Sequence, residues 1–167
     1  MKKIFDLQVV SISHYQGCTG TLYLHSLLDG HPQICTIPGV PTLLPIISNK
    51  YNTPEEALNH FNNVNPKFYD TSKMTRVDEN SAGLFSLGKG MNEGIQTDRR
   101  VFNNYYLNHM EGEKVTPRNV IISLYYAFTR AHKFDLSKLK VLLLHPHDPF
   151  PTFIFHEIFP ESKHLII

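Results

Sequence analysis

The sequence has few cysteines, almost no net charge and no long apolar run near its start. Cys18 and Cys35 are its two cysteines, too few for a disulfide framework, so a reducing compartment is expected. There are 16 Lys and Arg residues against 15 Asp and Glu residues, for a formal net charge of +1. This balance gives no general attraction to nucleic acid or to anionic lipid. Any anion site must therefore be local.

The first residues lack the features of a targeting segment. Lys2 and Lys3 are basic, but polar residues from Asp6 to His14 interrupt any apolar run long enough for a signal peptide or membrane anchor. We see no internal repeat, low-complexity tract or linker. The sequence therefore predicts a soluble, cytoplasmic protein without a nucleic-acid or membrane partner.

Length and hydrophobic content fit one domain. A chain of 167 residues with 41% hydrophobic residues can fill a single core. Residues 162–167 resemble a strand that is entering a core where the sequence stops. We therefore expect one domain over residues 1–167, with its C-terminal portion missing.

The apolar segments predict strands that alternate with helices. Four segments have the β-branched or continuous apolar character of strands covered on both faces: residues 7–13, 34–37, 139–144 and 163–167. Five segments carry helical spacing or helix-start signals: residues 22–28, 53–61, 98–110, 117–132 and 150–159. The pattern predicts an α/β fold with a mainly parallel sheet flanked by helices.

Two stretches lack a sustained pattern. Residues 38–45 are punctuated by prolines and predict irregular structure. Residues 62–98 are polar and contain several glycines, so they predict mostly loop, with a possible helix over residues 81–87. Loops that gate a substrate often have this composition, and so do ordinary connections.

A loop with two glycines and two threonines joins the first strand to the first helix. Such a junction directs backbone N–H groups and the positive end of the helix dipole toward one point, where an anion fits. Gly17 and Gly20 would let the backbone approach a phosphate, while Thr19 and Thr21 could add hydroxyl donors. The alternative is a plain strand-to-helix turn.

Three better-known types of phosphate-binding loop do not match this sequence. A nucleotide triphosphatase needs a lysine after the last glycine, and Gly20 is followed by Thr21 and Leu22. A cysteine phosphatase would need an arginine to close the loop that begins at Cys18, and residues 19–24 contain no basic residue. A dinucleotide-binding loop would need three spaced glycines. Cys18 also remains a candidate redox thiol, because helix N-termini favour thiolates.

The loop and the helix after it resemble the 5′-phosphosulfate loop of the PAPS-dependent sulfotransferase family. In that family a basic residue precedes Ser-Gly-Thr-Thr, an apolar helix and a closing His-Pro. Thr19, Gly20 and Thr21 match Ser, Gly and the first Thr, while Leu22 replaces the second Thr and residues 31–32 supply the His-Pro. Residues 142–146 and 159–167 form a second block, which resembles the family's later strand, proline-containing turn and Phe-Pro-acid strand.

The resemblance implies a P-loop-like architecture and a function. The activity would be transfer of a sulfuryl group from 3′-phosphoadenosine 5′-phosphosulfate (PAPS) to a hydroxyl or amine of a small-molecule, sugar or lipid acceptor, by in-line displacement and without a metal. The residues implied to bind PAPS are Gln16, Gly17, Cys18, Thr19, Gly20, Thr21 and Leu22. A non-catalytic nucleotide- or anion-binding module derived from the same fold is the alternative.

The sequence departs from the family where positive charge is expected. The loop cation falls on Cys18, a second lysine falls on Leu144, and the family's 3′-phosphate motif would begin after Ile167. Losing a cation aimed at a leaving oxygen weakens transition-state stabilisation. Residues that could compensate are His14, His25, His145, Lys73, Lys89, Arg99 and Arg100.

Two histidines are candidates for the base that deprotonates the acceptor. His145 and His147 lie two residues apart at a strand end, where alternate residues share a face. Each could serve as a base, as a metal ligand or as a structural residue of the turn. His147 is preferred as the base because it lies beyond the proline, nearer the expected cleft. Glu93 and Asp98 are alternative bases, for which solvent exposure and helix capping are competing roles.

Overall fold

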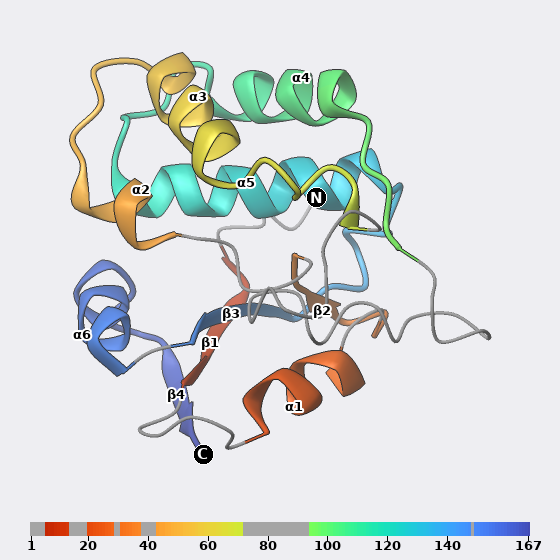
Figure 1. The fold of residues 1–167 in the computed structure, drawn as a ribbon, viewed down its shortest axis with the longest axis vertical. Coiled ribbons are helices and arrows are strands. Elements are labelled where there is room, and N and C mark those ends of the chain that lie inside the picture. The colour runs from red at the N-terminus through yellow and green to blue at the C-terminus, as the bar shows by residue number, and fades with distance from the viewer. Residues whose placement is uncertain (1–5, 14–19, 29–30, 38–42, 72–93, 148) are drawn as a thin grey trace.

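The computed structural model describes residues 6–13, 20–28, 31–37, 43–71, 94–147 and 149–167. Within them, four strands form one all-parallel sheet in the order β2-β3-β1-β4 (Figure 1). The strands are β1 (Gln8–Ser13), β2 (Ile34–Cys35), β3 (Val141–His147) and β4 (Lys163–Ile166). The predicted α/β class with a parallel sheet is confirmed.

Helices cover both faces of this sheet. They are α1 (Thr21–Leu28), α2 (Leu44–Ser48), α3 (Pro54–Val64), α4 (Arg99–Met110), α5 (Pro117–Ala131) and α6 (Pro149–Ile158). Figure 1 shows α2 to α5 gathered above the sheet, α1 alone below it, and α6 beside the end of the sheet that carries β4. No helix in these described ranges is long and apolar enough to cross a lipid bilayer.

Three helices begin at the side chains that the sequence indicated. The Thr53 side chain accepts a hydrogen bond from the backbone of Glu56, and the Thr116 side chain accepts one from Asn119. Asp98 accepts two hydrogen bonds from the first turn of α4. Each cap pairs with N–H groups that a helix start leaves unbonded. In contrast, α2 lies partly within a stretch predicted to be irregular, and Leu43 before it makes no capping hydrogen bond.

Strand β3 is longer than the sequence predicted. The predicted strand covered residues 139–144 and ended at a turn over residues 145–149, whereas β3 begins at Val141 and continues through His147. Ser11 and Ser13 of β1 lie opposite Leu144 and His147, so β3 has one extra residue there and forms a bulge. Pro146 falls in this irregularity, where a strand tolerates a residue without an N–H group.

The aromatic core lies between the helices above the sheet. Phe68 packs its ring against Phe61, Phe102 and Phe128 at centroid distances of 5.1, 5.3 and 5.9 Å. The apolar stripe predicted for α5 is buried at every position: Val120, Ile121, Leu124, Tyr125 and Phe128. Burial of this apolar surface is the main stabilising contribution.

Candidate functional site

The chain connections of the sheet reverse direction between β3 and β1. From β1 the chain passes through α1 to β2, on the far side of β3. From β3 it passes through α6 to β4, on the far side of β1. In open parallel sheets, ligands bind outside the carboxyl ends of the strands at such a switch point. The candidate site is therefore the carboxyl edge of β1 and β3 together with the start of α1.

Gly20 begins α1 at this edge. Its φ is +83°, in the left-handed region that favours glycine, and its carbonyl accepts the 2.9 Å hydrogen bond from Leu24 N. A Cβ added at Gly20 would meet none of the described atoms within 4 Å. Thr21 follows as a buried first residue of the helix, and no acidic residue occupies the first turn. The strand, glycine and helix start stand in the predicted order.

Several predicted site residues lie outside the part of the chain that is described. These are Gln16, Gly17, Cys18 and Thr19 of the loop, the base candidate Glu93, and the cation candidates His14, Lys73 and Lys89. Leu22 and His147 have described backbones, in α1 and β3, while their side chains fall outside the description. Binding of PAPS by the seven loop residues, and the role of His147 as base, stay predictions.

His145 belongs to a buried polar network that joins three elements at the carboxyl edge. Its Nδ1 lies 2.9 Å from Nδ1 of His25 on α1, and Nε2 of His25 lies 2.8 Å from Oγ1 of Thr36, just after β2. The two imidazole rings meet edge to face, with centroids 5.0 Å apart. All three side chains are at most 5% exposed. This burial favours an indirect role for His145 over direct contact with an acceptor.

Burial keeps the imidazole of His25 neutral at neutral pH. Desolvation lowers the pKa of His25 to about 4. His25 therefore does not supply the positive charge that the loop lacks.

The network also links the tautomers of the two histidines. A neutral imidazole has one donor and one acceptor nitrogen, so a single proton lies between the two Nδ1 atoms. If Thr36 accepts from His25 Nε2, His145 donates through Nδ1 and keeps a basic lone pair on Nε2. If the Thr36 hydroxyl donates instead, His145 carries its proton on Nε2. The direction of the hydrogen bond at Thr36 thus sets which nitrogen of His145 carries the proton.

Sequence reasoning missed this network, because it gave His25 and His145 as separate candidates and did not pair them. The contacts of His25 with Thr36 and His145 span 11 and 120 residues. No sequence pattern shows pairings over such distances.

A cavity of about 190 Å³ opens beside the network, on the β2 side of the sheet. Thr36 is one of its lining residues, and the others are His31, Pro32, Ile34, Phe134, Asp135, Lys138 and Leu139. Thr36 thus connects this cavity to the buried histidines.

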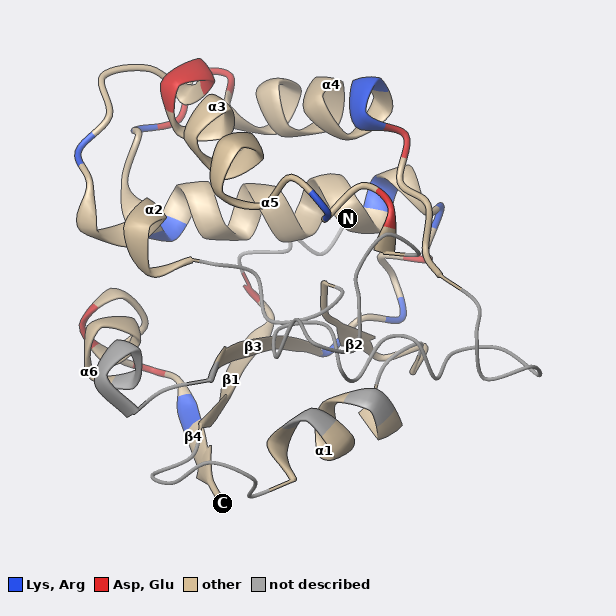
Figure 2. Cartoon of the chain, viewed as in Figure 1, with Lys and Arg blue, Asp and Glu red and all other residues tan. Residues whose placement is uncertain are grey.

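Positive charge is scarce at the candidate site. The described parts of β1, α1 and β3 contain no Lys or Arg. Figure 2 shows basic residues around the helices above the sheet and on β4 instead. Arg99 and Arg100 start α4, across the sheet from α1 (Figure 1), and the Arg99 guanidinium lies 5.3 Å from the ring centre of Tyr69. Asp98 caps the same helix, which accounts for its carboxylate without a role as a base.

The described residues contain no group of three or more His, Cys, Asp or Glu side chains placed to hold a metal ion. Comparisons with protein-family models, with curated proteins and with solved structures give no match for this chain.

Proposed function

We propose that this chain is a PAPS-dependent sulfotransferase that binds its donor at the β1–α1 junction. The observation that carries the proposal is the place of this junction in the fold. It leaves a central strand of a parallel sheet at the switch point, and it enters α1 through a left-handed glycine. The sequence resemblance to the 5′-phosphosulfate loop falls on the same residues, and it implies a strand, a loop and a helix in this order.

The proposed reaction forms one bond while another breaks. The acceptor oxygen or nitrogen bonds to sulfur as the bond from sulfur to the bridging phosphate oxygen breaks, which releases 3′-phosphoadenosine 5′-phosphate (PAP). The first turn of α1 would stabilise the charge that develops on this leaving oxygen, through backbone N–H groups and the helix dipole. His147, at the carboxyl end of β3, would take the proton from the acceptor.

One observation favours the second candidate, a module that binds the nucleotide without turnover. Lys and Arg are absent from the described residues of β1, α1 and β3, and burial keeps His25 uncharged. Backbone N–H groups suffice to bind an anion, whereas rapid sulfuryl transfer calls for more positive charge at the leaving oxygen.

Two measurements on the full chain distinguish these candidates. Calorimetric titration with PAP, with ATP and AMP as controls, measures binding. Incubation with ³⁵S-labelled PAPS and a panel of phenol, sugar and amine acceptors measures transfer. Transfer that depends on an acceptor supports the sulfotransferase, and PAP binding without transfer supports the module. If PAP does not bind at millimolar concentration, both candidates are rejected.

A further inference from the structure

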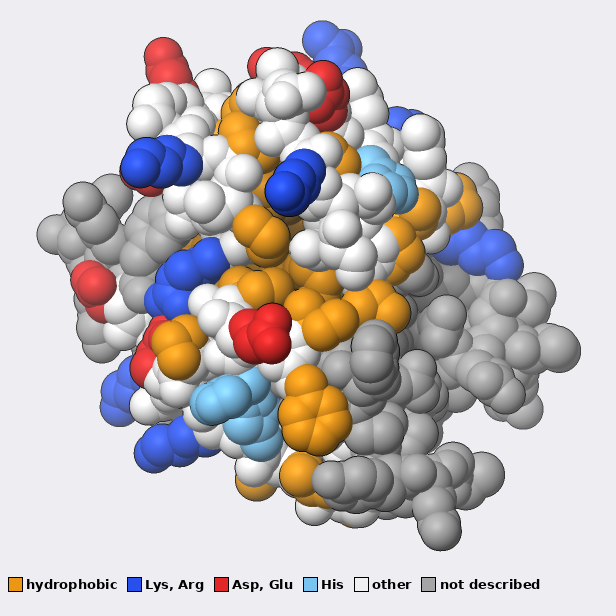
Figure 3. Space-filling view, turned by 90° about the vertical axis from the view of Figure 1, so that its left-hand side faces the viewer, with side chains coloured by type: hydrophobic (Ala, Val, Ile, Leu, Met, Phe, Trp, Pro, Cys, Tyr) orange, Lys and Arg blue, Asp and Glu red, His pale blue; other side chains and the backbone are white. Residues whose placement is uncertain are grey.

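A second histidine pair lies at the free edge of the sheet. His156 belongs to α6 and His164 to β4, and His156 Nδ1 is 3.3 Å from His164 Nε2. The His156 side chain is exposed and that of His164 is partly exposed. Figure 3 shows histidine side chains gathered near the lower border of this face of the molecule. Solvent and dissolved ions can therefore reach the pair.

The separation of the two nitrogens suits one metal ion. Two imidazole nitrogens about 2.0–2.1 Å from a tetrahedral Zn²⁺ lie about 3.3–3.4 Å apart. The 3.3 Å contact is a hydrogen bond between the two rings, and its length falls in this range, so an ion would take the place of the proton between them. We infer that His156 and His164 form a binding site for a divalent late transition-metal ion of the Zn²⁺ or Cu²⁺ type.

A buried serine contacts the other ring nitrogen of His164. Ser11 Oγ of β1 is 2.5 Å from His164 Nδ1, and Ser11 is 1% exposed. When Nδ1–H donates to this hydroxyl, Nε2 keeps the lone pair that faces His156. Histidines that bind metals commonly use their second nitrogen in this way, which fixes the tautomer and the ring orientation. Ser162 Oγ also hydrogen-bonds this Nε2, at 3.0 Å, and would give up that bond to the ion and hydrogen-bond one of the ion's waters instead.

The ligand set determines which ions bind. No third His, Cys, Asp or Glu among the described residues joins the two histidines, so water completes the coordination sphere. Imidazole ligands favour zinc, copper and nickel over magnesium and calcium, which prefer oxygen. An ion held by both rings would fasten β4 to α6. The site would therefore stabilise the edge strand, whether or not the carboxyl edge binds a nucleotide.

The test uses the full chain after treatment with a chelator. Calorimetric titration with Zn²⁺ should show one ion per chain, and Cu²⁺ should give the electron paramagnetic resonance signature of nitrogen ligands. His156→Ala and His164→Ala should each weaken Zn²⁺ binding at least about tenfold, and Ser11→Ala should weaken it by a similar factor. Zn²⁺ should raise the thermal midpoint of the wild type but not that of His156→Ala.

The controls are an exposed histidine elsewhere and a hard cation. His31→Ala should leave Zn²⁺ affinity unchanged, and Mg²⁺ should not bind to the pair. Because His156 is exposed on a helix, its replacement keeps the fold even if the His164 variant unfolds the sheet edge. Unchanged affinity in His156→Ala, or one ion shared by two chains, would overturn the inference.

Discussion

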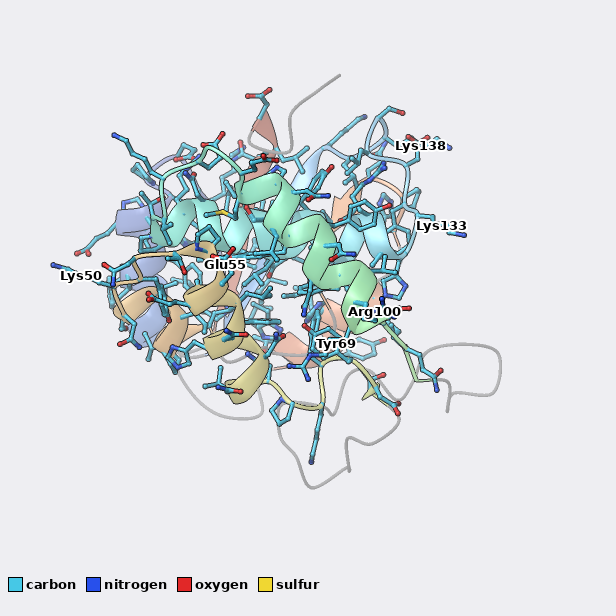
Figure 4. The ribbon with its side chains drawn as sticks, turned by 90° about the horizontal axis from the view of Figure 1, so that it is seen from above. Lys50, Glu55, Tyr69, Arg100, Lys133 and Lys138 are labelled. Carbon is cyan, nitrogen blue, oxygen red and sulfur yellow. The ribbon has the colours of Figure 1, made fainter. Side chains whose placement is uncertain are left out.

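The helices above the sheet bury aromatic hydrocarbon, whereas the carboxyl edge of the sheet buries hydroxyl and imidazole groups. Phe61 and Phe102 are fully buried in the helical layer. Charged residues of that region, such as Lys50 and Lys133, point outward into solvent (Figure 4). At the carboxyl edge the buried groups are Ser13, Thr21, Thr36, His25 and His145. Apolar burial stabilises without requiring particular partners, whereas buried polar groups need them.

The two kinds of burial contribute differently to stability and to chemistry. A satisfied buried polar network adds little net stability compared with a packed hydrocarbon core, but it holds donors and acceptors in fixed positions. Such positions are what binding and proton transfer require. The comparison therefore supports the proposed site at the carboxyl edge, and it predicts that changes in the two regions will have different consequences.

The largest effect is expected from a cavity in the helical layer. Phe102→Ala should lower the free energy of unfolding by about 3–5 kcal/mol, because Phe102 is fully buried against Phe61 and Phe68. Urea denaturation measures this loss. Val101→Ala is the matched control, since Val101 is 38% exposed on the same helix and should change stability by less than about 0.5 kcal/mol. Equal losses in both variants would contradict the assignment of the core.

The next effect is a loss of stability in acid that originates at the carboxyl edge. The pKa of His25 falls from 6.5 to about 4 on folding, so the unfolded chain binds an additional proton between these values. The contribution of neutral His25 to the free energy of unfolding is fully present above pH 6.5 and is lost as the pH falls toward 4. Its size is about 3 kcal/mol.

Replacement of the histidine isolates this contribution from those of other histidines. His25→Gln should flatten the decline of unfolding free energy between pH 6.5 and pH 4, and His31→Gln, at an exposed position, should not. Urea denaturation at several pH values gives both slopes. If His25→Gln leaves the wild-type slope intact, His25 is not held neutral by burial.

Much of the fold could be predicted because its signals are local. Thr53, Asp98 and Thr116 start their helices with their own side chains, and each apolar run overlaps one of the four strands. The errors came from structure that depends on distant partners. Helix α2 has no capping side chain, and the extension of β3 through Pro146 depends on a bulge in its pairing with β1. Pairing between strands leaves no mark at a single position in the sequence.

Only the part of the candidate site that has a local sequence signal could be predicted. The place of Gly20 and Thr21 follows from a strand, a small-residue loop and a helix in succession. The buried network could not be predicted in this way, because His25, Thr36 and His145 come from separate segments that folding brings together. Sequence reasoning also named His145 as a candidate base; its burial favours an indirect role, and its role as a base stays a prediction.

Two glycines allow a matched test of the phosphate site. Gly20 and Gly112 both have a left-handed φ, +83° and +77°, and an added Cβ would meet no described atom at either position. Alanine at each should therefore cost a similar amount of stability, about 1 kcal/mol. Only Gly20→Ala should weaken PAP binding, because its methyl group enters the space where the backbone approaches the ligand.

Thermal unfolding and calorimetric titration measure these two quantities on the same samples. A similar stability loss with a selective loss of affinity in Gly20→Ala would tie the anion site to the start of α1. If both variants lose affinity for PAP equally, the loss reflects lower general stability. The assignment of the nucleotide site to the carboxyl edge would then be rejected.

The smallest effect concerns an ion pair that links the helical layer to the segment before β4. Arg118 Nη2 is 2.6 Å from Glu161 Oε1, and both side chains are partly exposed. Glu161→Gln should therefore cost less than about 1 kcal/mol, and less still in high salt. Arg118→Gln should cost more, because the guanidinium also donates to the Ile158 carbonyl and lies 4.8 Å from the Phe159 ring centre. Equal costs, measured by urea denaturation at low and high salt, would show that charge rather than packing couples the two regions.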